Sequence, residues 1–179
     1  DVRYRFQWTF PVHISPHDNE TVYAGSQHVH RTTDEGHTWE VISPDLTRND
    51  PTKMQKTGGL TTEDVSPTYA SVLFAIAESP IESGLIWTGS NDGLVQLTRD
   101  NGQSWEDVTP NIPDLPEWGT VSNVEPSRFD AGTAYITVDF HQLGNTDPYV
   151  YKTEDYGQSW RSLSVGIPRS VFSYAHVVR

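Results

Sequence analysis

An eight-residue pattern occurs three times along the 179-residue chain, and this repetition constrains the fold more than any other feature. Each copy reads Thr-x-Asp-x-Gly-x-Thr/Ser-Trp, and the copies begin at Thr32, Thr98 and Thr153. An apolar alternating run precedes each copy and another follows it, so three matches are not a coincidence of composition. We therefore interpret the chain as a series of equivalent structural units.

Each unit contains four short strand-like segments separated by turn residues. The first segments end at a proline and span 10–16, 74–80 and 121–126; the second span 22–26, 86–90 and 134–138; the third span 29–32, 94–98 and 149–153; the fourth span 39–42, 105–108 and 160–163. Four antiparallel strands per repeated unit is the arrangement of a β-propeller blade. The sequence therefore predicts an all-β fold, a partial β-propeller of about three four-stranded antiparallel blades.

The repeated pattern has a structural explanation at every position. Asp and Gly suit a tight hairpin between the third and fourth strands, because Asp accepts bonds from nearby backbone N–H groups and Gly tolerates positive φ. The Trp can bury a large apolar face, and we expect all three to be mostly buried between adjacent sheets. The residues interpreted as structural are Thr32, Asp34, Gly36, Trp39, Thr98, Asp100, Gly102, Trp105, Thr153, Asp155, Gly157 and Trp160.

The same residues do not predict a metal site. Calcium needs six to eight oxygen ligands, and one carboxylate in each separate turn does not gather them. His28 and His30 share one side of a strand and could form half of a zinc site, but no second pair with matching spacing completes it. We therefore predict no metal and no cofactor.

The pattern is that of the Asp-box, also called the BNR repeat, which occurs in sialidases, xyloglucan-degrading propeller hydrolases, the sortilin ectodomain and photosystem II assembly factors. Over nearly its whole length the chain resembles large exported bacterial proteins described as glycosyl hydrolase BNR-repeat or VPS10 (sortilin-like) proteins. The stretches that carry this resemblance are 43–47, 58–61, 74–80, 95–100 and 148–153. The resemblance implies a propeller fold and an extracytoplasmic location, periplasmic or secreted, but no settled activity.

The repeat also divides the chain. We predict blade 1 at 1–44, an inserted loop at 45–72, blade 2 at 73–112, blade 3 at 113–169 with an insertion at 139–148, and the first strand of a further blade at 170–179. Three blades do not close a propeller, which typically has four to eight. We expect a fragment of a longer protein, or a partial propeller whose open edges are covered by a partner.

The two insertions are where a binding function is expected, because loops carry specificity on a rigid scaffold. Both belong to connections that reach the channel face of a propeller, so we expect them to lie together there. The alternative is that they are merely long surface loops. The candidate binding residues are Asp50, Lys53, Lys56, Glu63, Asp64, Asp139, His141 and Asp147.

Composition excludes some partners. The net charge of −12 argues against nucleic acid and against anionic lipid surfaces. No run of about eighteen apolar residues is present, so no membrane span is predicted. Cysteine is absent, which removes disulfides as a source of stability.

Glycoside hydrolysis would need two carboxylates on either side of a sugar. The acids considered for it outside the Asp-boxes are Asp45, Asp50, Glu63, Asp64, Asp92 and Asp139, and the sequence does not show that any two converge. The arginines are scattered, without the cluster that a sialidase requires. We therefore assign no catalytic residue.

We predict a non-enzymatic module that binds protein or peptide, as an accessory part of an extracytoplasmic assembly. Its partner would be another protein or the remaining blades of the same chain. The alternative is a fragment of a polysaccharide-active glycoside hydrolase or a carbohydrate-binding propeller. In that case Trp8 and Trp118, which the strands and Asp-boxes do not use, would be the sugar platforms.

Overall fold

The computed structural model describes residues 3–54 and 71–169, and it consists of three four-stranded antiparallel sheets. Each sheet keeps its strands in sequence order, with neighbours joined by short connections. Blade 1 contains β1 (Val12–Ile14), β2 (Val22–Gly25), β3 (Val29–Thr32) and β4 (Glu40–Val41). Blade 2 contains β5 (Leu73–Glu78), β6 (Ile86–Ser90), β7 (Val95–Thr98) and β8 (Glu106–Asp107). Blade 3 contains β9 (Thr120–Pro126), β10 (Ala134–Asp139), β11 (Tyr149–Thr153) and β12 (Arg161–Ser162).

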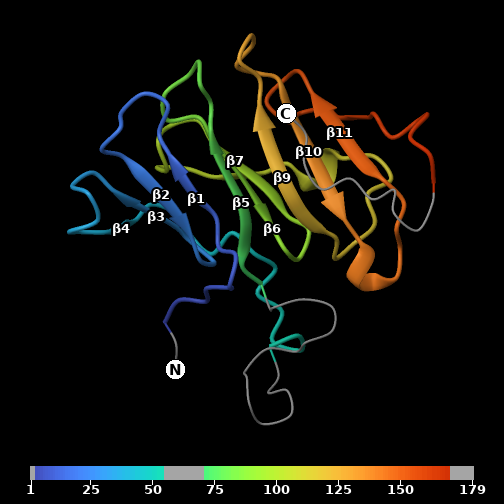
Figure 1. Cartoon of the computed structure of the whole chain (residues 1–179), viewed down its shortest axis with the longest axis horizontal. Helices are drawn as coiled ribbons and strands as arrows, with labels where there is room; N and C mark the ends of the chain where they lie inside the picture. The colour runs from blue at the N-terminus through green and yellow to red at the C-terminus, as the bar shows by residue number, and fades with distance from the viewer. Residues whose placement is uncertain (1–2, 55–70, 170–179) are drawn as a thin grey trace.

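The three sheets are arranged side by side like sectors of a disc (Figure 1). Their first strands adjoin at the centre, where β5 contacts both β1 and β9. The last strands, β4, β8 and β12, lie at the far edge of each sheet. The predicted partial propeller of about three blades is confirmed.

The core lies between the sheets. Between blades 2 and 3, alternate strand residues such as Trp87, Leu97 and Ile136 are almost completely buried. A smaller core between blades 1 and 2 contains Tyr23 and Val29. Burial on this scale is the main stabilising contribution to such a fold.

The Asp-box turns are closed by their own side chains. In blade 2 the Thr98 hydroxyl donates to Asp100 Oδ1 at 2.7 Å, and the Ser104 N–H donates to the same oxygen at 2.8 Å. The Ser104 hydroxyl donates to Asp100 Oδ2 at 2.5 Å, and the Gly102 N–H donates to Thr98 Oγ1 at 2.9 Å. Blades 1 and 3 repeat these bonds.

These bonds stabilise the ionised carboxylates. The hydroxyl and the N–H of Ser104 lower the pKa of Asp100 to about 2, and those of Thr38 lower the pKa of Asp34 to about 2. The pKa of Asp155 is lowered in the same way, first by the Ser159 hydroxyl. Each Asp is therefore engaged in closing its own turn.

The prediction that all three Asp-box tryptophans are mostly buried is wrong for Trp39. Trp160 is 7% exposed and stacks edge-on against Trp87 of blade 2 at 6.1 Å, whereas Trp39 is 47% exposed. Trp105 is half-buried, and its Nε1 donates to the Ile42 carbonyl of blade 1 at 3.0 Å. Each Asp-box packs on the blade before it, and in the described part of the chain no blade precedes Trp39.

Some predicted features lie outside the described residues. They are the candidate residues Lys56, Glu63 and Asp64, and the further strand at 170–179. In the described part of the chain, no helix has the length and apolar character needed to cross a membrane.

Candidate functional site

The ends of the blades opposite the Asp-boxes form one continuous surface, which we call the loop face. The first insertion joins two blades there, because the Leu46 N–H donates to the Gln27 carbonyl at 3.0 Å and the Asn91 N–H donates to the Val72 carbonyl at 2.9 Å. The Thr120 hydroxyl donates to the Asn91 carbonyl at 3.3 Å and brings in blade 3. The loop face therefore comprises 26–28, 45–54, 71–72, 91–93, 113–119 and the connection after β10.

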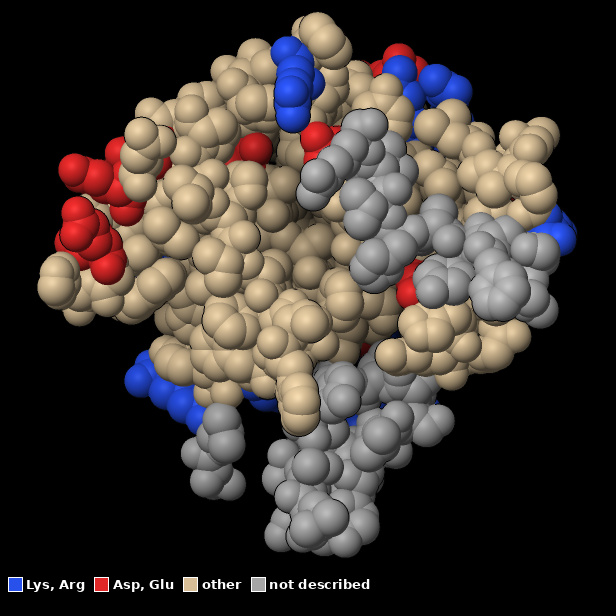
Figure 2. Space-filling view, viewed as in Figure 1, with Lys and Arg blue, Asp and Glu red and all other residues tan. Residues whose placement is uncertain are grey.

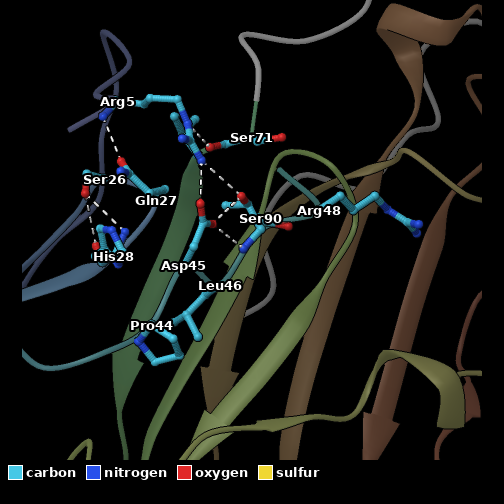
Figure 3. A network of polar contacts seen from close by, with 12 residues as sticks. Arg5, Ser26, Gln27, His28, Pro44, Asp45, Leu46, Arg48, Ser71 and Ser90 are labelled. Carbon is cyan, nitrogen blue, oxygen red and sulfur yellow. Dashed lines mark hydrogen bonds and ion pairs between the residues drawn. The ribbon is translucent and has the colours of Figure 1, made fainter. Parts of the chain in front are cut away.

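A network around Arg5 and Asp45 fixes one part of the loop face (Figure 3). Arg5 Nη2 lies 2.8 Å from Asp45 Oδ2, and Arg5 Nε donates to the Ser71 carbonyl at 3.0 Å. The Thr47 hydroxyl donates to Asp45 Oδ1 at 2.5 Å. The backbone N–H of Arg5 donates to Gln27 Oε1 at 2.7 Å. This network holds the segment before β1 and both described ends of the first insertion in place.

Arg48 links the insertion to blade 2 and then points away from the Arg5 network (Figure 3). Its N–H donates to Asp92 Oδ2 at 2.9 Å, and its Nε donates to the Asp92 carbonyl at 2.8 Å. The Ser90 hydroxyl donates to the other Asp92 oxygen at 2.5 Å. Asp92 is therefore fully engaged in positioning Arg48, and it is itself completely buried.

Beyond Asp92, two cations lie over one aromatic ring. The Arg48 guanidinium is 5.3 Å from the centre of the Trp118 ring, and Lys53 Nζ is 5.5 Å from it. The exposed carboxylate of Glu117 is 3.9 Å from Arg48 Nη1. We call Arg48, Lys53, Glu117 and Trp118 the cation–aromatic patch. Cations within about 6 Å of an indole face are attracted by its electrons.

The backbone of the loop face is strained at several positions. Asn49, Ser71 and Trp118 have positive φ values of 48°, 51° and 69°. Residues with side chains seldom adopt this region, and each costs on the order of 1–3 kcal/mol. Positive φ is not confined to the loop face, because Glu35, Asn101 and Tyr156 of the Asp-box turns have φ values of 57°, 60° and 58°. The loop face is the leading candidate surface because it carries the first insertion and the cation–aromatic patch.

The candidate carboxylates of this face are held by their own loops. Asp50 accepts bonds from the N–H and hydroxyl of Thr52 at 2.8 and 2.7 Å, which lower its pKa. Asp139 is buried, and its Oδ2 lies 2.6 Å from Nδ1 of the more exposed His141. Asp147 faces Arg169 at 3.5 Å. Within 3–54 and 71–169, no three Asp, Glu or His side chains gather as metal ligands.

The structure does not bring the described candidate residues together in one site. Lys53 joins the cation–aromatic patch, whereas Asp139 and His141 form a separate pair and Asp147 lies elsewhere. The pairing of Arg48 with Trp118 was not predicted from the sequence, and neither was any role for Glu117. Arg48 lies in the first insertion and Trp118 in the connection between β8 and β9, and no local pattern links them.

The two proposed sugar platforms differ. The Trp118 ring is half-buried and faces Arg48 and Lys53, so it is not a free apolar surface. Trp8 is 93% exposed. Only Trp8 retains the open indole face that stacking on a sugar requires.

The fold of the chain is similar to that of known propeller proteins. The xyloglucanase of glycoside hydrolase family 74 from Xanthomonas campestris matches with a TM-score of 0.58 and 18% identity over 89% of this chain and 23% of that one. The family 74 enzyme from Niastella koreensis matches with a TM-score of 0.56 and 15% identity over 87% and 22%. YCF48 from Cyanidioschyzon merolae matches with a TM-score of 0.54 and 17% identity over 90% and 42%.

These similarities establish the propeller fold and nothing finer, because every identity is below 20%. The chain spans less than half the length of each of these solved structures. No protein-family profile and no curated protein matches the sequence.

Proposed function

We propose that this chain is a non-enzymatic propeller module of the Asp-box type, which binds a protein or peptide through its loop face. We also propose that it works outside the cytoplasm, as the resemblance to exported BNR-repeat and sortilin-like proteins implies. The partner would present a carboxylate to Arg48 and Lys53, beside an apolar side chain that packs on the edge of Trp118.

The cation–aromatic patch is the observation that carries this proposal. Trp and Arg are the residues most enriched among those that dominate binding energy in protein interfaces. Here both are held by a rigid scaffold, because Asp92 anchors Arg48 at its backbone and at Nε. A rigid side chain loses less conformational entropy on binding, which favours affinity.

The carboxylates support the same conclusion. Asp45, Asp50, Asp92 and Asp139 each accept short hydrogen bonds that shape their own segments. A general acid or nucleophile for glycoside hydrolysis needs a carboxylate that faces the substrate. These four acids are instead used to position the residues around them, whereas Glu117 is exposed beside Arg48.

A peptide array that varies the number of Asp and Glu residues tests the proposal, followed by titration calorimetry on the peptides retained. Trp118→Ala and Lys53→Gln should each weaken binding about tenfold, the loss typical of a central interface residue. Arg128→Gln is the matched control, because Arg128 is exposed in the β9–β10 turn at the other end of blade 3. Binding that survives Trp118→Ala and Lys53→Gln unchanged would rule out the cation–aromatic patch.

The alternative is a carbohydrate-binding propeller or a fragment of a polysaccharide-active hydrolase. The observation that favours it is the open indole of Trp8, on a fold shared with family 74 enzymes. A glycan array and a reducing-sugar assay on xyloglucan would decide. Glycan binding that is lost in Trp8→Ala, with no peptide retained by the array, would replace the proposed function with this one.

A further inference from the structure

The cation–aromatic patch combines two cations with one carboxylate. Arg48 and Lys53 carry the positive charges over the Trp118 ring, and Glu117 carries the negative charge beside them. A partner that presents a carboxylate to Arg48 therefore meets Glu117 as well. Like charges that are brought together weaken binding, so the position of Glu117 bears on which acidic partners the loop face accepts.

The bonds between Arg48 and Asp92 decide which part of the guanidinium a partner can reach. The backbone N–H of Arg48 donates to Asp92 Oδ2 at 2.9 Å, and Nε donates to the Asp92 carbonyl at 2.8 Å. These bonds leave the two Nη groups for other contacts. In the described part of the chain, Glu117 faces them, with Oε1 3.9 Å from Nη1. The end of Arg48 that a partner can reach is therefore the end that Glu117 faces.

The backbone next to Glu117 is fixed by the same turn that holds Arg48. This turn joins β6 to β7, and its Gly93 directly follows the aspartate that anchors Arg48. A Cβ added to Gly93 would lie 3.2 Å from the Gly119 carbonyl oxygen and 3.4 Å from the Trp118 nitrogen. The turn therefore packs closely on the connection that carries Glu117, and it places that connection relative to Arg48.

The Glu117 side chain is not locked onto Arg48. It is 74% exposed, and its distance of 3.9 Å from Nη1 is at the outer limit of an ion pair. Exposed pairs of this kind change an equilibrium constant by a factor of only about 1.4 to 5. A partner carboxylate can thus approach Arg48 without breaking a strong bond, while Glu117 stays close by.

Acidic residues elsewhere on the protein act less strongly on a peptide bound at the patch. The chain carries a net charge of −12, and Figure 2 shows red atoms gathered over the blade 1 loops at the left edge, away from the lower end that carries the loop face. Charges farther away than the Debye length, about 8 Å at physiological ionic strength, are largely screened. Glu117 lies well inside that length from Arg48, so its charge acts on whatever binds there.

We propose that Glu117 makes the loop face selective for a peptide with a single carboxylate beside an apolar side chain, and against a run of acidic residues. This inference rests on the proposed function. The first carboxylate is attracted by Arg48 and Lys53, whereas a second carboxylate on the same peptide is placed beside Glu117. That repulsion offsets the attraction that the second carboxylate would otherwise gain. Glu117 thus acts on specificity by opposing the wrong partner.

Titration with two synthetic peptides, followed by NMR, tests this selectivity and detects weak as well as tight binding. Each peptide contains one leucine followed by one or two aspartates in a glycine–serine background, with both ends blocked so that only side chains carry carboxylates. The indole N–H signal of Trp118, identified by its loss in Trp118→Phe, reports on binding at the patch. With Glu117 in place, the second aspartate should bring no gain in affinity. In Glu117→Gln, the peptide with two aspartates should bind about threefold tighter than the peptide with one.

Two further variants separate selectivity from a structural role. Glu20→Gln is the matched control, because Glu20 is an exposed carboxylate in the β1–β2 turn at the opposite end of the blades, and it should leave both affinities unchanged. Glu117→Asp keeps the charge and should keep the selectivity, whereas a structural role would change the affinity for both peptides by the same factor. In about 1 M salt, where the Debye length is about 3 Å, the effect of Glu117→Gln on the ratio of the two affinities should disappear.

The outcomes distinguish this inference from the proposed function. If neither these peptides nor those retained by the array shift the Trp118 signal, the proposed function fails and the inference fails with it. If the second aspartate already tightens binding about threefold with Glu117 in place, the proposed function stands and the inference is wrong. Loss of binding to both peptides in Glu117→Gln would also overturn the inference, because Glu117 would then support the site instead of opposing a second carboxylate.

Discussion

The three Asp-box tryptophans provide an internal comparison of the same side chain at three levels of burial. Trp160 is 7% exposed and packs in the core between blades 2 and 3, and its replacement by Ala should cost about 3–5 kcal/mol. Trp39 is 47% exposed. The difference in burial is about 100 Å² of a side chain that buries up to about 250 Å². At about 25 cal/mol per Å², this lowers the expected cost of Trp39→Ala by about 2.5 kcal/mol.

Trp39→Ala should therefore cost only about 1–2 kcal/mol, because the site also opens to water and leaves no closed cavity. Trp105→Ala should lie between the two. Urea unfolding followed by far-UV circular dichroism measures this order without relying on tryptophan emission. The protein is kept dilute enough to be a single chain in sedimentation. Equal losses for Trp39→Ala and Trp160→Ala would refute the conclusion that each Asp-box is buried by the preceding blade.

Three further outcomes follow from the contacts. The pKa of Asp100 is lowered to about 2, so its contribution to the free energy of unfolding is complete above about pH 4 and is lost as the pH falls toward 2. Asp100→Asn should therefore reduce the change in the free energy of unfolding between about pH 4 and pH 2. His13 Nε2 accepts the Glu78 N–H at 3.1 Å, and burial lowers the pKa of His13, so the protein should lose stability as the pH falls below about 6.5. His13→Gln should reduce that loss, measured by urea unfolding at about pH 7 and pH 5. Gly102→Ala should cost more than Gly144→Ala in thermal unfolding, because both have positive φ but only Gly102 faces a carbonyl at 2.6 Å, whereas Gly144 has open space; equal costs would contradict that contact.

The sequence was sufficient to predict the blades because each strand and turn is specified locally. Alternating apolar residues set the strands, and Asp100 closes its turn with partners no more than four residues away. The exposure of Trp39 was not predictable in the same way. It depends on whether another blade packs against that turn, and the motif is identical in all three units.

The candidate site was predictable only in part. The insertions were recognisable as interruptions of the repeat. Lys53 and Asp50 lie in the part of the first insertion that belongs to the loop face. The contact between Arg48 and Trp118 depends on two connections that converge across blade 2. Buried Asp92 directs that convergence, and its role follows from the neighbouring Ser90 and Arg48 and not from spacing.

The Asp-box end and the loop face differ in how far the three units share the same residues. At the Asp-box end the three units carry the same residues, and each of those residues closes a turn or packs on the previous blade. Toward the loop face the units share only a Ser or Thr, at 43, 109 and 164, that accepts the N–H of a third-strand Val. The connections beyond it differ, and the first insertion provides two of the four residues of the cation–aromatic patch. A contact that every blade makes keeps the same residues in each unit, whereas a contact made once requires particular residues in one connection. The bonds of Leu46 and Asn91 also join blades at the loop face, so contacts between blades occur at both ends. We expect a partner to be recognised at the loop face because the connections there differ from one unit to the next.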